Sequence, residues 1–347
     1  MKFALVGAGG IAQSYAAAFE KHPDARLVAV ADVRPDAASA LAARFGCPAF
    51  ASPEKLFEAG PAFDAAILCT PPDTHERLTL ALVRRGVHVL CEKPFTFTGG
   101  SARAMARAAG EAGALLTMGS KFRYVADVIR AKELIASGLI GEVVLFENAF
   151  TARVDMKARW NSDPAVSGGG VLIDNGTHSV DLMRYFLGPL AEVHAVEGKN
   201  VQGLAVEDTA RLFVKSRSGI MGSVDLSWSI DKELDWYDNV YGSLGTIQIG
   251  WKQSRYKVTP GREWVAFGKG YDKVQAFRDQ VANFARAIRG TEPLRINWED
   301  AVASVEVVEA AYLSLRASAW TGIESPNRDG TPLSLPTLDA LRGILHA

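Results

Sequence analysis

Short apolar runs alternate with amphipathic segments along the first third of the chain. The apolar runs have the length of buried strands, and they occupy residues 3–6, 26–32, 64–70, 87–92 and 114–118. Between them, apolar positions recur at helical spacing, and three of these segments end at Pro23, Gly46 and Gly86. Because strands separated by helices pair in parallel, the pattern predicts an α/β fold with a doubly wound parallel sheet.

The pattern changes after Gly119. A long helix is predicted over residues 121–138, then a strand over 142–150 and a helix directly behind the glycine run at 168–170. Segments of strand pattern with short turns follow at residues 192–198, 208–216, 219–229, 234–243 and 245–250. Because no helices separate these segments, we expect a large, mainly antiparallel sheet.

Two more helices are expected near the end of the chain. One has apolar residues at Phe277, Val281, Phe284 and Ile288, and the other extends from Asn297 to about Ser318. Together the two patterns predict two domains, a Rossmann domain at residues 1–119 and a second α/β domain at residues 120–347.

A glycine-rich turn follows the first predicted strand directly. It has the sequence GAGGIA and consists of Gly7, Ala8, Gly9, Gly10, Ile11 and Ala12. A helix, a second strand and Asp32 come next, which completes the fingerprint of a dinucleotide-binding βαβ unit. Gly7 permits the tight turn, Gly9 lets the backbone approach a pyrophosphate, and the first helical amides face its charge. Ala12 stands where a third glycine is common.

Asp32 bears on the choice of cofactor. A carboxylate here accepts hydrogen bonds from a ribose 2′-hydroxyl and repels a 2′-phosphate, which favours NAD. Arg34 lies two residues further on, where its side chain either contacts a 2′-phosphate, covers the adenine, or is simply exposed beside Pro35. NAD is therefore the expected cofactor, and NADP remains an alternative.

Ligands of doubly wound sheets bind at the carboxyl ends of the strands. Besides the glycine turn and Asp32, the residues expected at these ends are Thr70, Pro71, Pro72, Glu92 and Lys93. Pro94 keeps Lys93 out of helical geometry and allows a cis peptide bond. Lys93 is thus either a functional residue beside the nicotinamide or an ordinary solvent-exposed lysine.

Composition narrows the function further. The chain has 347 residues, of which 48% are hydrophobic and 22% charged, and its net charge of −1 gives no general attraction to nucleic acid or anionic lipid. The first apolar run is too short for a signal peptide or a membrane span, so a cytoplasmic protein is expected. The three cysteines, Cys47, Cys69 and Cys91, fit structural positions better than a disulfide framework, and no histidine pair has metal-ligand spacing.

The predicted helix behind the glycine run carries three titratable groups on one face. Asp174, His178 and Asp181 are spaced i, i+4 and i+7, behind what reads as a flexible glycine hinge. Asp181 has a structural interpretation, in which it pairs with Arg184 or caps local structure.

In this order, the segments GAGGIA, Asp32, CTPPDTH, CEKP and GGGVLIDNGTH resemble the glucose–fructose oxidoreductase and inositol dehydrogenase family. The segments GSKFRY and KELIASGLIGEV also resemble the link into that family's second domain, so the resemblance spans nearly the whole chain. It implies a Rossmann domain followed by a domain with an open-faced sheet, through which members assemble as homodimers or homotetramers. It also places His75, within CTPPDTH, at the cofactor.

The resemblance assigns site residues as well. The catalytic lysine of the family falls on Lys93, and its helix aspartate and histidine fall on Asp174 and His178. The glycine run would bring that helix close to the cofactor, opposite Lys93. Arg123, Trp160 and Asn161 lie in segments that could line the substrate pocket, although each also has an ordinary packing or surface interpretation.

We therefore expect an NAD(P)-dependent oxidoreductase that acts on a secondary alcohol of a sugar, a polyol or a related carbohydrate. His178 would accept the hydroxyl proton, Asp174 would orient the imidazole of His178, and Lys93 would donate a hydrogen bond to the reacting oxygen. Two alternatives remain open. One is a glycosidase that oxidises a sugar transiently with bound NAD, and the other is a non-catalytic NAD-binding sensor.

Overall fold

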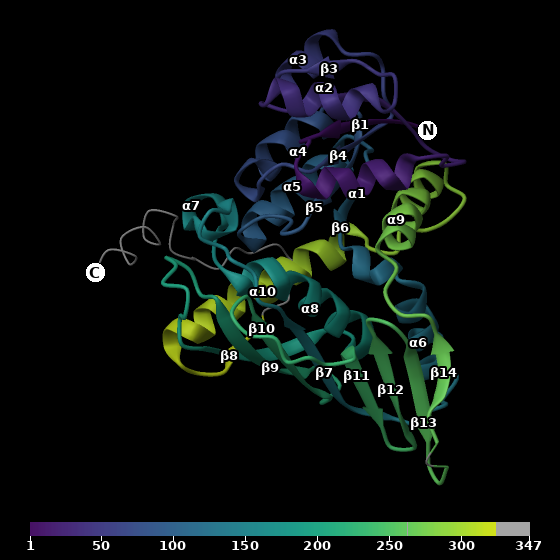
Figure 1. Ribbon diagram of the computed structural model, residues 1–347, viewed down its shortest axis with the longest axis vertical. Helices are drawn as coiled ribbons and strands as arrows, with labels where there is room; N and C mark the ends of the chain where they lie inside the picture. Colours follow the sequence, from purple (N-terminus) through teal and green to yellow (C-terminus); the bar gives the residue numbers. More distant parts are fainter. Residues whose placement is uncertain (262, 324–347) are drawn as a thin grey trace.

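The computed structural model describes residues 1–261 and 263–323, which form two sheets with helices around and between them (Figure 1). The predicted second domain therefore extends beyond the described residues at its carboxyl end. The first sheet has six strands in the order β3-β2-β1-β4-β5-β6, and all neighbours are parallel. Its strands are β1 (Lys2–Val6), β2 (Arg26–Ala31), β3 (Ala49–Phe50), β4 (Ala65–Leu68), β5 (His88–Glu92) and β6 (Leu116–Gly119). The predicted doubly wound sheet is confirmed.

Helices connect these strands, as the alternating pattern predicts. They are α1 (Gly10–Phe19), α2 (Pro35–Ala43), α3 (Pro53–Ala59), α4 (His75–Val83) and α5 (Gly99–Glu111), with the 3-10 turn η1 (Pro72–Thr74) before α4. Ser52 and Thr98 cap α3 and α5 through their side chains, whereas α1 begins at Gly9 without a side-chain cap. The first amides of α1 are therefore available to a ligand.

The second sheet has nine strands in the order β14-β13-β12-β11-β7-β10-β9-β8-β15. They are β7 (Val143–Thr151), β8 (Leu190–Glu197), β9 (Thr209–Ser216), β10 (Met221–Ser227), β11 (Trp236–Gly242), β12 (Gly245–Gly250), β13 (Ser254–Val258), β14 (Val265–Gly268) and β15 (Thr321–Gly322). Only β7 and β10 pair in parallel, so the prediction of a mainly antiparallel sheet is confirmed. Strands β13, β14 and β15 were not predicted.

The helix predicted over residues 121–138 is wrong in its first part. The structure has a 3-10 turn, η2 (Lys121–Tyr124), then extended backbone at Val125, and only then helix α6 (Ala126–Ala136). The side chain of Gln275 accounts for the break, because its amide donates to the carbonyl of Tyr124 at 2.8 Å and its oxygen accepts from the amide of Ala126 at 3.2 Å. These contacts replace hydrogen bonds that a continuous helix would make.

One face of the second sheet is covered and the other is open. Helices α8 (Val171–Leu187) and α10 (Trp298–Ala317) lie between the two sheets (Figure 1). Along β9, burial alternates strictly, so that Leu212 and Val214 face the helices while Arg211 and Phe213 face outward. The predicted open-faced sheet is therefore present.

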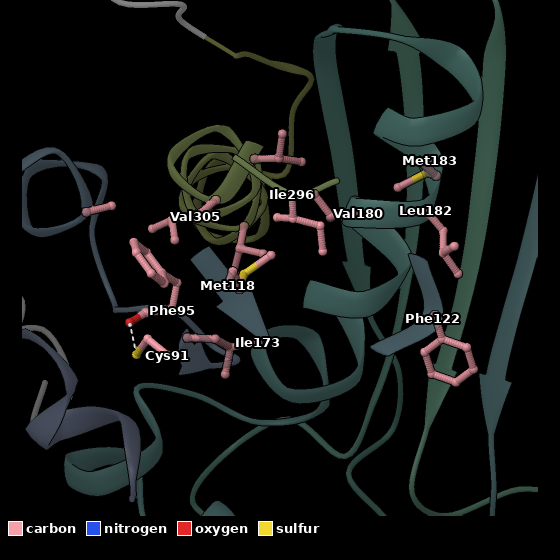
Figure 2. Close-up of a cluster of buried hydrophobic side chains, with 14 of the residues drawn as sticks. Cys91, Phe95, Met118, Phe122, Ile173, Val180, Leu182, Met183, Ile296 and Val305 are labelled. Carbon is pink, nitrogen blue, oxygen red and sulfur yellow. Dashed lines mark hydrogen bonds between the residues drawn. The ribbon is translucent and has the colours of Figure 1, made fainter. Parts of the chain in front are cut away.

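Helix α8 joins the two halves of the molecule through its apolar side. Figure 2 shows Cys91 and Met118, from the first sheet, in the same apolar cluster as Ile173 and Val180 of α8 and Val305 of α10. The orientation of α8 is thus set by side chains from both sheets.

Helix α9 (Lys273–Ile288) returns to the first sheet. Phe277 packs edge-on against Tyr15 of α1 at 4.7 Å between ring centroids, and Phe284 packs against Phe3 of β1 at 6.2 Å. The boundary at residue 119 therefore separates the two sheets, but α9 completes the core of the first. The remaining short elements are η3 (Trp160–Ser162) and α7 (Pro164–Ser167). Within the described ranges, no helix is both long and apolar enough to cross a membrane.

Candidate active site

The turn after β1 requires glycine at position 7. Gly7 has a φ of +94°, and its amide donates to the carbonyl of Ala31 at 2.7 Å. A Cβ atom here would lie 2.7 Å from the carbonyl group of Cys69 at the end of β4. A side chain at position 7 would therefore collide with the backbone that follows β4, and it would also be strained at this φ. The glycine-rich turn and the uncapped amides at the start of α1 together form a cradle that fits a pyrophosphate.

Asp32 lies at the end of β2, beside the glycine turn. Its carboxylate accepts hydrogen bonds from the amides of Ala8 at 2.6 Å and Arg34 at 2.8 Å, and from Nε of Arg34 at 3.2 Å. Burial raises the pKa of Asp32, but these hydrogen bonds outweigh burial and leave the pKa below its usual value. Asp32 is therefore a carboxylate, as the ribose-binding role requires, while the exposed Arg34 side chain lies against it.

Thr70, Pro71 and Pro72 follow β4, and their turn is tied to the end of β5 by His75. One ring nitrogen of His75 lies 2.9 Å from the carbonyl oxygen of Thr70, and the other lies 2.9 Å from that of Pro94. The ring is fully buried, so a direct contact between His75 and a cofactor, as predicted, is wrong. Burial lowers the pKa of His75, so the neutral ring donates to one of these two carbonyl oxygens. The ring thus lies between two loops at the carboxyl ends of the strands, which we call the ligand-binding edge.

The side chains of Glu92 and Lys93, at the end of β5, point in different directions. The Glu92 carboxylate is buried, where it accepts from the Tyr15 hydroxyl at 2.7 Å and from the amide of Lys93 at 3.1 Å. Burial raises the pKa of Glu92. Its oxygens are thus used inside the protein, and Glu92 fixes the backbone of Lys93 rather than reaching outward.

Lys93 crosses to helix α8, where it meets Asp174. Nζ of Lys93 donates to Oδ1 of Asp174 at 2.5 Å and to the Asp174 carbonyl at 3.0 Å. The two side chains are 15% and 20% exposed, so the pair is shielded but reachable. Residues 81 positions apart are therefore brought together at the ligand-binding edge, where both were predicted.

The predicted dyad of Asp174 and His178 is wrong, because each side chain has a different partner. Nε2 of His178 lies 3.0 Å from Nζ of Lys121, a residue that no sequence pattern above indicated. Nδ1 of His178 is buried, and in the described part of the chain it has no hydrogen-bond partner. One turn of helix separates Asp174 from His178, but Lys93 and Lys121 approach them from different strands.

Electrostatics keep His178 neutral. Burial lowers the pKa of His178 well below its usual value, and the positive charges of Lys121 and Lys93 lower it further. Burial also lowers the pKa of Lys121 to about 7, with the charge of Lys93 acting in the same direction. A neutral imidazole and a lysine that loses its proton near neutral pH are both suited to accept a proton. The sequence signal that could have found Lys121 is its place just after β6, at the same edge as Lys93.

The glycine run before α8 is tightly packed, which corrects the idea of a flexible hinge. The carboxylate of Glu207 accepts from the amides of Gly170 and Leu172, both at 3.0 Å, and from the hydroxyl of Tyr312 at 2.8 Å. A Cβ atom at Gly169 would collide with Tyr312, and one at Gly170 would collide with the backbone of Glu207. The glycines therefore permit close contacts that fix the start of α8.

Arg123 and Asp181 form a buried ion pair under the site, at 3.0 Å. Asp181 also accepts from the hydroxyl of Ser120 at 2.8 Å, and Arg123 donates to the carbonyl of Arg295 at 3.2 Å. Two predictions are corrected here. Arg123 does not line a pocket, because its guanidinium is used internally, and the partner of Asp181 is Arg123 rather than Arg184.

Trp160 and Asn161 lie in the turn η3, which precedes α7. Trp160 is 44% exposed and Asn161 is partly buried. Helix α7 packs near η1, at the ligand-binding edge of the first sheet. Contact of these two residues with a substrate stays a prediction. Among residues 1–261 and 263–323, no group of three or more His, Cys, Asp or Glu side chains is arranged to hold a metal ion.

Comparison with known proteins agrees with this geometry. Residues 1–120 match the family model "Oxidoreductase family, NAD-binding Rossmann fold", and residues 128–248 match the model "GFO/IDH/MocA C-terminal domain". Inositol 2-dehydrogenase from Rhizobium meliloti (strain 1021) is 27% identical over 335 residues, which cover 91% of this chain and 97% of the relative.

Two further relatives show the same arrangement over much of the chain. Levoglucosan dehydrogenase from Pseudarthrobacter phenanthrenivorans is 26% identical over 286 residues, which cover 72% of this chain and 73% of the relative. The crystal structure of GenD2 from gentamicin A biosynthesis in complex with NAD is 26% identical, with a TM-score of 0.82 over 94% of this chain and 97% of its own. Both domains of one family thus match in the same order, and the chain belongs to the Gfo/Idh/MocA family of oxidoreductases, with an NAD-binding Rossmann domain first.

Proposed function

We propose that this protein is an NAD(P)-dependent dehydrogenase that oxidises a secondary alcohol of a sugar, a polyol or a related carbohydrate. The observation that carries the proposal is the contact of Lys93 with Asp174, at 2.5 Å. This contact lies one helical turn from His178, at the same edge of the first sheet as the glycine-rich turn. Relatives named for inositol and levoglucosan support a carbohydrate substrate. A sensor would need the dinucleotide cradle but not these three side chains.

Each side chain has a chemical role in this proposal. A bound nicotinamide dinucleotide supplies the acceptor for the hydride. Lys93 donates a hydrogen bond to the reacting oxygen and stabilises the negative charge that develops there, while Asp174 holds the lysine in place. The hydroxyl proton passes to the His178–Lys121 pair, whose imidazole is neutral.

NAD is the proposed preference over NADP. The carboxylate of Asp32 lies next to the amide of Ala8 in the glycine turn, where a ribose diol can reach it. A 2′-phosphate at the same place would meet a negative charge. Arg34 offsets part of that repulsion, since its guanidinium already contacts Asp32.

We also propose that the protein assembles as a homodimer or homotetramer through the open face of the second sheet. Phe213 and Met221 are 37% and 56% exposed on that face, next to an ion pair between Arg211 and Asp225. Apolar side chains on an uncovered sheet are often covered by another protein chain.

A panel of carbohydrates and polyols tests the proposed function. We expect reduction of NAD, read as absorbance at 340 nm, with at least one neutral or acidic sugar or polyol, and a slower reaction with NADP. The panel includes matched glycosides, and cleavage without net formation of NADH would identify the NAD-dependent glycosidase instead. Tight binding of NAD with neither reaction would favour the sensor. Lys93→Ala serves as the inactive control.

A further inference from the structure

Lys121 lies at the same edge of the first sheet as Lys93, for a simple topological reason. Strands β5 and β6 are parallel neighbours, and Glu92 is paired with Gly119 in their register. Lys93 follows Glu92 directly, and Lys121 is two residues beyond Gly119. Because the carboxyl ends of parallel strands meet at one edge, both lysines emerge beside the place where the reaction is proposed.

The contact between Lys121 and His178 determines which atom can meet a substrate. A neutral imidazole has one nitrogen that carries a proton and one that carries a lone pair. Nδ1 of His178 is buried and Nε2 lies 3.0 Å from Nζ of Lys121, so the nitrogen facing the site is already engaged by the lysine. His178 is 6% exposed, whereas Lys121 is partly exposed.

From this geometry we propose that Lys121, in its amine form, takes the proton from the substrate hydroxyl, and that His178 is its hydrogen-bonded positioning residue. The inference rests on the proposed function, because it assigns a step of that oxidation. Nδ1 of His178 is enclosed, and Nε2 faces Lys121 rather than open space. Of the imidazole and the amine, Lys121 is therefore the base that a hydroxyl group at the site can reach.

The charges around Lys121 support its role. Burial and Lys93 lower its pKa to about 7, Lys273 acts in the same direction, and Glu92 and Asp174 act in the opposite one. The pKa of His178 is lowered by burial and by both lysines, so the imidazole is the weaker base of the pair. A base works best when its pKa lies near the working pH, as that of Lys121 does.

The step balances without any further reagent. The O–H bond of the alcohol breaks, and its proton bonds to the lone pair on Nζ of Lys121. The electron pair of the neighbouring C–H bond leaves with the hydride, which the bound dinucleotide accepts, and a carbonyl group forms. Lys121, now an ammonium group, donates to Nε2 of His178 and returns its proton to water through its exposed side.

The pH dependence of kcat/KM for oxidation tests this assignment. Lys121 is active only without its proton, so wild-type kcat/KM should fall as the pH drops through about 7. Lys121→Arg keeps the charge but cannot lose it, so we expect a loss on the order of 10²- to 10⁴-fold. Lys121→Ala should lose as much and recover in part when small primary amines, such as methylamine, are added. Lys273→Met removes a nearby positive charge that lowers the pKa of Lys121, so it should move the fall of kcat/KM to a slightly higher pH and leave the rate at high pH unchanged.

Acetylation by acetic anhydride provides a readout that does not depend on activity. Peptide mass spectrometry across pH should show Lys121 reacting with a midpoint near pH 7, far below the midpoints of other lysines. His178→Leu removes the positioning contact, because leucine has no polar atom to meet Nζ of Lys121. It should weaken oxidation by lowering kcat more than it raises KM, and it should move the acetylation midpoint of Lys121.

The outcomes separate the two proposals. If the wild type oxidises no carbohydrate or polyol, the proposed function fails and this assignment fails with it. Suppose instead that the wild type is active, and that Lys121→Arg keeps its rate within a few-fold and still loses kcat/KM as the pH falls through about 7. Then only the assignment fails, and His178 is the proton acceptor. Failure of amines to rescue Lys121→Ala, together with an ordinary midpoint for acetylation, would also overturn it.

Discussion

The hydrogen-bond partner of Lys93 is Asp174, whereas that of His178 is Lys121. Lys93 and Asp174 are each mostly shielded from water, and their contact at 2.5 Å satisfies both charges. Removal of one partner leaves the other charge partly buried and uncompensated, which costs more than the loss of an exposed ion pair. Mutations of this pair should therefore affect catalysis and local stability together.

Lys93→Ala should reduce kcat by on the order of 10²-fold or more, because the reacting oxygen loses a charged donor. Asp174→Asn should cost less, since the amide can still accept a hydrogen bond from Lys93. Because the two residues are in contact, the losses should not add in the double variant, which a double-mutant cycle on kcat measures. Additive losses, with unchanged melting temperatures, would show that the pair is not a unit.

Asp32→Ser should narrow or invert the preference for NAD. The substitution removes the charge that repels a 2′-phosphate and frees the guanidinium of Arg34 from its contact at 3.2 Å. The ratio of kcat/KM values for NAD and NADP measures the effect, and Arg34→Ala in the Ser variant is the control. A wild-type preference for NADP of more than about tenfold, or about 1.4 kcal/mol, would contradict this role of Asp32.

At the scale of elements, the start of α8 is set by contacts that reach it from elsewhere in the second domain. Glu207 precedes β9 and Tyr312 lies on α10, yet both meet the glycine run that carries α8 into the site. An anionic group at a helix N-terminus is also favoured by the helix dipole. The position of Asp174, one turn into the helix, follows from these contacts.

Glu207→Gln should destabilise the protein by about 1–3 kcal/mol, because the amide of Gly170 would face a side-chain donor where Oε2 now accepts, and the start of α8 would lose an anionic acceptor. Gly169→Ala should be at least as harmful, because its Cβ atom would collide with Tyr312. Urea unfolding gives the free energies.

Gly110→Ala is the matched control for the glycine substitution. Gly110 lies inside α5 with no atom within 4 Å of an added Cβ, so alanine should be neutral or stabilising. If Gly169→Ala is equally harmless and keeps full activity, the run is the flexible hinge that the sequence first indicated.

At the scale of the whole molecule, the site is built where two sheets meet through α8 and α10 (Figure 1). The covered face of the second sheet fixes α8 against the first sheet. Its other face has exposed apolar residues on adjacent strands, among them Phe213 on β9 and Met221 on β10. The covered face of the second sheet thus positions the helix of the site, and the exposed face is the one through which we propose that copies associate.

The double variant Phe213→Glu with Met221→Glu should dissociate the proposed homo-oligomer. Charges on this face would lie against the same face of a second copy, where their burial is unfavourable. Size-exclusion chromatography with light scattering measures the mass. Val201→Glu, at a residue 65% exposed in a loop, is the control and should leave the mass unchanged. A wild-type protein that is monomeric at every concentration would contradict the proposed assembly.

The sequence by itself determined the features that depend on neighbouring residues. The turn at Gly7, the strands before and after α1, and the place of Asp32 follow from short-range patterns, because a strand, a glycine turn and a helix are local structures. Parallel topology then located Lys93 at the ligand-binding edge. The i, i+4 spacing placed Asp174 and His178 on one helical face, and both lie at the site.

Only the tertiary structure decided which side chains meet. Lys93 contacts Asp174 across 81 residues, Lys121 contacts His178 across 57, and Arg123 contacts Asp181 across 58. Gln275 breaks the predicted long helix from a position about 150 residues further on. Helical spacing specifies a face but not what lies opposite it. Those partners depend on how two sheets pack against α8, and that packing is a property of the whole chain.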